Sequence, residues 1–88
     1  MNIKDIFRDE VSKVSPEIQK QVDLSFAIAD KIASVLEERK MTQKQLSKLV
    51  GCTEADVCRW LGGTHNFTIR TIARISTALE VDLINVSE

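Results

Sequence analysis

The centre of the chain holds two short amphipathic segments separated by three residues, of which the first is a glycine, and few small folds accommodate such a pair. Thr42 and Gln45 have the spacing of a capping box, in which a hydroxyl and a side-chain amide each satisfy a free backbone N–H at a helix start. Thr53 opens the second segment, with Asp56 three positions later. Gly51 suits the left-handed conformation that ends one helix and turns into the next. The sequence therefore predicts two short helices joined by a tight turn.

A longer helix is predicted before this pair. Ser15 and Pro16 have the pattern of an N-cap followed by proline at the first helical position, and they predict a helix over 16–40. Such a helix is roughly 37 Å long at 1.5 Å per residue. We therefore expect part of it to project or to pack on a second subunit. Its apolar residues recur every three or four positions: Ile18, Val22, Phe26, Ala29, Ile32 or Ala33, and Leu36.

Another helix is predicted after the pair. Thr68 is its expected N-cap, and its apolar stripe is Ile69, Ile72, Ile75 or Ser76, and Leu79. Gly62 and Gly63 are expected to end the preceding helix in the same left-handed way as Gly51.

The fold class predicted from these segments is all-α, with five helices and no secure strand. Residues 15–88 form the domain, and residues 1–14 are an N-terminal extension that the sequence leaves open between helix and disorder. The apolar residues from Val81 to Val86 allow a short strand, a last helical turn or a frayed tail.

Length and composition exclude several functions. A chain of 88 residues buries only about 60–65% of its unfolded surface, so its core has little room to enclose a substrate. His65 is the only histidine, and the spacing of Cys52 and Cys58 matches no strong zinc pattern. We therefore expect no enzyme activity, no catalytic or metal-binding residues and no cofactor.

No segment has the character of a secretion signal or a membrane span. Residues 1–10 mix acids and bases, and Asp30 and Lys31 interrupt the most apolar stretch, Leu24–Leu36, well short of the roughly 18 residues that a span needs. The expected location is the cytoplasm, with no membrane partner.

Charge is unevenly distributed along the chain. The net charge is −1. Residues 1–38 carry five cations and eight anions, and the last fourteen residues carry three anions and no cation. The middle segment, 39–74, carries only Glu54 and Asp56 against seven cations: Arg39, Lys40, Lys44, Lys48, Arg59, Arg70 and Arg74. A basic middle between acidic ends is compatible with a nucleic-acid partner.

The two central helices, with motif bounds 42–61, have the form of a helix-turn-helix, which lays its second helix in the DNA major groove. Leu46, Leu49 and Val50 are expected on the inner side of the first helix. Val57 and Trp60 are expected to face the core from the second. The residues expected to face outward are Glu54, Ala55, Cys58 and Arg59. Thr42, Gln43 and Thr53 lie at helix starts, where backbone N–H groups bind phosphates.

The segment from Met41 to Leu83, MTQKQLSKLVGCTEADVCRWLGGTHNFTIRTIARISTALEVDL, resembles the phage-repressor and Cro-like helix-turn-helix family, also called the xenobiotic-response-element family of regulators. The shared features are TQxxL, the G-x-T turn, V-x-x-W-L-x-G and I-x-x-I-x-x-A-L, in order and at the right spacing. The resemblance implies a five-helix repressor-like domain. The THNFT stretch and the long preceding helix are similar to the antitoxin-type branch.

The resemblance also implies site residues. Gln43 would contact phosphate, and Lys44 would add charge there. The base-edge readers would be Glu54, Ala55 and Arg59, with Arg59 suited to bidentate contact with guanine. Thr64, His65 and Asn66 would follow the DNA backbone.

The function predicted is that of a homodimeric, sequence-specific regulator of transcription, a repressor, bound to an inverted-repeat operator in double-stranded DNA. The sequence leaves the dimer surface open between the tail 81–86 and the long first helix with residues 1–14. The alternative is an antitoxin or protein-interaction module that neutralises a toxin through residues 1–23, with or without operator binding. A third hypothesis treats the helix-turn-helix as a scaffold only.

Two departures from the family pattern matter. Glu54 occupies a place where many relatives carry Gln or Ser, and a carboxylate there either accepts from cytosine N4 or repels phosphate. Leu36 and Leu61 replace a buried Arg–Glu pair, which is physically coherent because packed apolar residues often substitute for such a pair without loss.

Overall fold

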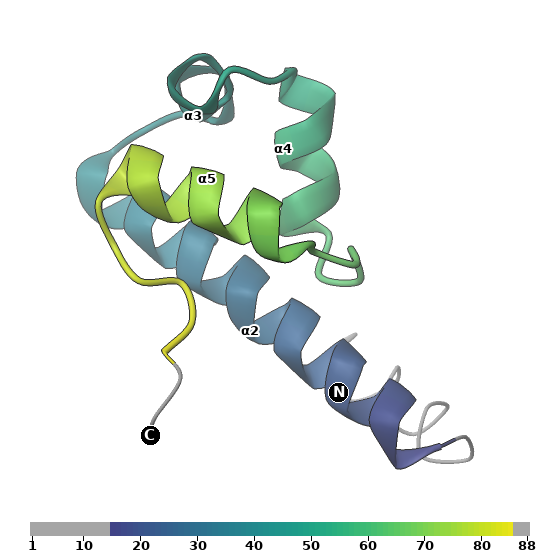
Figure 1. Cartoon of the computed structure of the whole chain (residues 1–88). Helices are drawn as coiled ribbons and strands as arrows, with labels where there is room; N and C mark the ends of the chain where they lie inside the picture. The colour runs from purple at the N-terminus through teal and green to yellow at the C-terminus, as the bar shows by residue number, and fades with distance from the viewer. Residues whose placement is uncertain (1–14, 86–88) are drawn as a thin grey trace.

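A computed structural model describes residues 15–85 of the chain, and within that range it contains four α-helices and no strand (Figure 1). The helices are α2 (Pro16–Arg39), α3 (Gln43–Val50), α4 (Glu54–Leu61) and α5 (Ile69–Leu79). The all-α class is confirmed. The predicted total of five helices is not, because four lie within 15–85, while residues 1–14 and Val86 lie outside the described part. From 81 to 85 the chain forms bends and neither a strand nor a helical turn.

Each of the four helices begins at the hydroxyl residue that the sequence indicated. Ser15 Oγ accepts from the Ile18 N–H at 3.3 Å, and Pro16 follows at the first helical position. Thr42 and Thr53 each form a complete capping box. Thr68 Oγ1 accepts from the Thr71 N–H at 3.1 Å. These side chains satisfy backbone donors that the helices themselves leave free, which fixes where each helix starts.

The helix ends also lie close to the expected positions. Gly51 ends α3 at φ 86°, in the left-handed region as predicted. The pair Gly62 and Gly63 was expected to end α4 in the same way: Gly62 is right-handed at φ −67°, and Gly63 makes the left-handed turn at φ 90°. Lys40 and Glu80 end α2 and α5 in the left-handed conformation although neither is a glycine.

The core joins all four helices around the C-terminal half of α2. Helix α3 packs on α4 and on α5, and α4 also packs on α2. Leu46 of α3, Val57 of α4 and Ile75 of α5 are fully buried together with Ile32 of α2. Removing this much apolar surface from water is the main force that holds two eight-residue helices at a fixed angle.

Three predicted core residues are exposed instead. Leu49 is 54% exposed because the buried face of α3 runs through Leu46, Ser47 and Val50, so that Ser47 takes the place expected for Leu49. Ile69 is 75% exposed at the first position of α5, where no helix covers it. Ile18 lies in phase with the core but in the first turn of α2, where it is 47% exposed. The N-terminal end of α2 extends past the other helices (Figure 1). Within the described residues, no helix is long and apolar enough to cross a membrane.

Candidate nucleic-acid interface

Helix α4 is divided lengthwise into a buried side and an exposed side. Val57 and Trp60 are buried in the core, where α4 packs on α2 and α3. The exposed residues are those predicted to face outward: Glu54, Ala55, Cys58 and Arg59. A helix braced from behind and open in front is the geometry that major-groove recognition requires.

Asp56 lies at the edge of this exposed side and makes three interactions. Its Oδ2 accepts from the Thr53 N–H at 3.1 Å, while its own N–H donates to Thr53 Oγ1 at 3.1 Å. Its Oδ1 accepts from Arg59 Nη2 in a close ion pair. Hydrogen bonds from Thr53 lower the pKa of the Asp56 carboxyl, and the charge of Arg59 adds to this effect.

Arg59 is therefore exposed but not free. Its side chain is 62% accessible to solvent while one of its terminal nitrogens is held by Asp56. This pair was not among the predicted contacts, although an acid and a base at i,i+3 on a helix are neighbours and the spacing was a signal for it.

The start of α3 presents its predicted residues to solvent. Thr42, Gln43 and Lys44 are all exposed. The Thr42 hydroxyl caps the helix by accepting from the Gln45 N–H at 3.1 Å, and the Gln45 amide oxygen accepts from the Thr42 N–H at 2.8 Å. The starts of α3 and α4 thus have the same construction.

The loop between α4 and α5 differs in part from expectation. Thr64 and Asn66 are exposed, but His65 is half-buried. The His65 ring packs edge-to-face on Phe67, with ring centroids 4.8 Å apart. This contact anchors the middle of the loop to the protein, so His65 is less accessible than its two neighbours.

A contact that the sequence could not reveal fixes the turn of the helix-turn-helix. Arg74 of α5 donates from Nη2 to the Val50 carbonyl, 24 positions earlier, at 3.1 Å. This bond satisfies a carbonyl at the end of α3 and ties α5 to the turn. Beside it, burial raises the pKa of the Cys52 thiol, with the Asp56 charge adding to the rise and Arg74 opposing it. A thiol held in its protonated form is a poor nucleophile and metal ligand.

The seven cations of the middle segment are all exposed. Within residues 15–85, no group of three or more His, Cys, Asp and Glu side chains is arranged to hold a metal ion. The exposed chemistry of this region is therefore dominated by positive charge, hydroxyls and amides, which are the groups that contact phosphates and base edges.

Comparison with known proteins gives one match. A family model described as the Cro/C1-type HTH DNA-binding domain matches residues 31–84, from the second half of α2 through α5 and into the tail that follows it. No curated protein and no solved structure matches the chain significantly. The matched range contains the capped pair α3–α4 and every predicted DNA-contacting residue, and it covers more than half of the chain. The chain therefore belongs to the Cro/C1-type helix-turn-helix family, whose members are DNA-binding regulators of transcription and not enzymes.

Proposed function

We propose that this protein is a homodimeric repressor that recognises an inverted-repeat operator by inserting α4 into the major groove. The observation that carries the proposal is the exposed side of α4, on which Glu54, Ala55 and Arg59 share one open face while Val57 and Trp60 brace the helix from behind. A repressor acts by occupying a promoter, so binding of sufficient specificity is its central requirement.

The contacts divide into two kinds. Arg59 reads guanine through O6 and N7, a pairing worth about 1–3 kcal/mol of discrimination against other bases. Glu54 and Ala55 contact neighbouring base edges. The phosphate contacts come from the two helix starts and the loop: Thr42, Gln43, Lys44, Thr53, Thr64, His65 and Asn66. Of these, His65 contributes least, because its ring is packed on Phe67.

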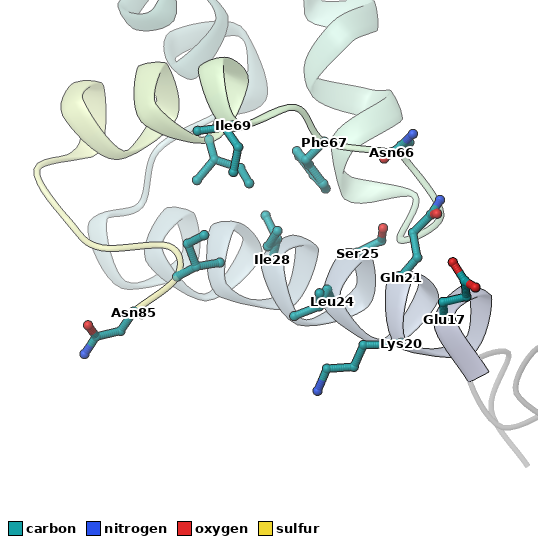
Figure 2. Close-up of a pocket in the computed structure, with 12 residues that line it drawn as sticks. Glu17, Lys20, Gln21, Leu24, Ser25, Ile28, Asn66, Phe67, Ile69 and Asn85 are labelled. Atoms are coloured by element: carbon teal, nitrogen blue, oxygen red, sulfur yellow. The ribbon is translucent and has the colours of Figure 1, made fainter. Parts of the chain in front are cut away.

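Dimerisation follows from the size of the module, since one recognition helix reads only a few base pairs. The proposed interface is an apolar groove of about 570 Å³ between the N-terminal half of α2, the start of α5 and the C-terminal tail (Figure 2). Leu24 and Ile28 form one wall, Phe67 and Ile69 another, and Ile84 closes the tail side. Part of each surface predicted for dimerisation lines this groove: Leu24 belongs to the first helix and Ile84 to the tail. Residues 1–14 and Val86, which were included in those predictions, lie outside the described residues.

Selection from random duplex DNA at near-physiological salt tests this function. We expect an enriched inverted repeat whose half-sites lie about 34 Å apart, or a multiple of that distance. Arg59→Ala is expected to weaken binding to the selected operator far more than binding to random duplex. Enrichment of no sequence would contradict the proposal, and equal losses on both DNAs would remove Arg59 from the base readers.

A second function, neutralisation of a toxin, is favoured by one observation. Ile18 is 47% exposed in the first turn of α2, within the region 1–23 where a protein partner was predicted. A gene for a small toxin-like protein beside this one would support the hypothesis. Co-purification of the two products as a stoichiometric complex that is lost on Ile18→Glu would then establish it, and intact complex formation by the variant would exclude this surface.

A further inference from the structure

Both oxygens of one carboxylate on the exposed side of α4 are engaged. Asp56 Oδ2 accepts from the Thr53 N–H, and Oδ1 accepts from Arg59 Nη2. The return bond from the Asp56 N–H to Thr53 Oγ1 closes the capping box. The position of Oδ1 is therefore set by the start of the helix and not by the rotamer preference of a free aspartate.

This anchoring distinguishes the pair from an ordinary surface ion pair. Exposed ion pairs contribute little, partly because two flexible side chains must be ordered to make one contact. Here the acid is already ordered by the capping box, so only the arginine has freedom left to lose. Asp56 is consequently a fixed acceptor against which the Arg59 guanidinium is oriented.

The pairing leaves Arg59 able to read a base. A guanidinium has five N–H donors in a rigid fork, and bidentate contact with guanine uses two of them. Asp56 engages one terminal nitrogen, and the side chain remains 62% exposed. An arginine that is already oriented loses less conformational freedom when it binds.

We propose that Asp56 is a positioning residue for recognition: it holds Arg59 in the orientation that reads guanine and touches no base itself. The proposal rests on the function proposed above. It also assigns a second effect to the same carboxylate, because a negative charge on the DNA-facing side opposes phosphate and weakens binding to random sequence. Both effects increase the ratio of operator affinity to random-duplex affinity.

The competing explanation is that Asp56 only competes with DNA for Arg59. Removal of the carboxylate would then free the arginine and strengthen operator binding at least as much as random binding. The two explanations predict opposite changes in the affinity ratio, so they can be separated.

The test uses the full chain and the operator obtained by selection, with four proteins: wild type, Asp56→Asn, Arg59→Ala and the double variant. The asparagine keeps an oxygen that can accept from the Thr53 N–H, so the helix start is preserved while the charge is removed. We expect Asp56→Asn to bind random duplex more tightly than wild type and to lower the affinity ratio by about tenfold, within the range for one bidentate base contact. In the Arg59→Ala background, the same substitution should leave base preference at the guanine position unchanged.

Two results would overturn the proposal. One is an unchanged or increased affinity ratio in Asp56→Asn. The other is an equal loss of guanine preference with and without Arg59, because Asp56 would then act independently of the arginine. If wild type selects no sequence, the proposed function itself fails; if it selects an operator and Asp56→Asn behaves as wild type, only the role of Asp56 fails.

Asp56→Glu provides the conservative variant. Glutamate also forms capping boxes at this position and keeps the negative charge. We expect it to recover part of the affinity ratio that asparagine loses, whereas a role limited to stabilising the helix would give equal ratios for the two variants. Thermal unfolding of each protein shows whether a change in ratio accompanies loss of fold.

Discussion

At residue scale, the carboxyl of Asp56 should make stability depend on pH in the acid range. Its pKa is lowered in the folded protein by hydrogen bonds from Thr53, whereas an unfolded aspartate has a pKa of about 3.9. A group with a lowered folded pKa stabilises the fold above its unfolded pKa, and the contribution is lost as pH falls through the folded value. We therefore expect the wild-type advantage over Asp56→Asn in thermal midpoint to be constant above about pH 4 and to shrink below it. A difference that does not change with pH would contradict this.

Lys44 gives a second test at this scale. It is exposed beside the start of α3, where the proposed interface meets phosphate. Lys44→Ala should weaken binding to all duplex sequences alike and reduce the slope of log K against log salt by about one. Lys31→Ala removes another exposed lysine, on α2 and outside the proposed interface, and should leave the slope unchanged. Equal slopes for wild type and Lys44→Ala would remove this lysine from the phosphate contacts.

At the scale of elements, Gly63 joins the end of α4 to the N-terminal half of α2. Its φ is 90°, and a Cβ built there would lie 2.5 Å from Cε1 of Phe26, whose ring is buried. Gly51 has a similar φ of 86°, but its nearest neighbour, an Arg74 nitrogen, is 4.0 Å away. Both positions have a left-handed backbone, which favours glycine. Only at Gly63 does a neighbouring side chain, the Phe26 ring, also lie too close to leave room for a Cβ.

Alanine substitutions at the two glycines separate these effects. Gly51→Ala should cost about 1–2 kcal/mol, the penalty for a left-handed backbone at a residue with a Cβ. Gly63→Ala should cost more, because the buried ring must also move. Urea unfolding of both variants measures the difference. Equal losses of unfolding free energy in the two variants would show that the Phe26 ring moves aside without an energetic cost.

The helix starts could be predicted from the sequence and parts of the helix faces could not. Thr42 and Thr53 signal a start through bonds to residues three positions away, so a local pattern contains the whole interaction. Exposure at Leu49 and Ile69 depends on which other element covers a face, and the pattern within one helix does not contain that information. The bond from Arg74 to Val50 spans 24 positions and has no local signal.

Across the molecule as a unit, the sequence predicted which residues of α4 are exposed. It did not predict that two side chains on that side, Asp56 and Arg59, form an ion pair. Outward and inward positions follow from helical phase, which is why Val57 and Arg59 were assigned correctly to opposite sides. The ends of α2 and α5 lie close to the predicted positions, but the left-handed backbone at Lys40 and Glu80 was not predicted because neither residue is a glycine. In each case the backbone N–H of the left-handed residue donates to carbonyls in the last turn of its helix.

The groove of Figure 2 provides the test of assembly. Leu24 is 47% exposed on its wall, so Leu24→Glu should leave the monomer folded and place a charge inside the proposed interface. We expect sedimentation to show a monomer that binds half-sites but has lost tight binding to the inverted repeat. Leu49→Glu changes a comparably exposed leucine on α3 and should remain dimeric. A dimeric Leu24→Glu protein would place the interface elsewhere.

In the proposed complex with DNA, the two acidic residues on the exposed side of α4 have a consequence for the search within a genome. Every non-operator site competes for the same few molecules, and the number of such sites is very large. In that complex Glu54 and Asp56 would oppose the phosphates while the cations of segment 39–74 attract them, so that each visit to an incorrect site would be shortened. Fewer copies of the protein would then be sequestered on the rest of the chromosome, and a small cellular pool would suffice to keep the proposed operator occupied.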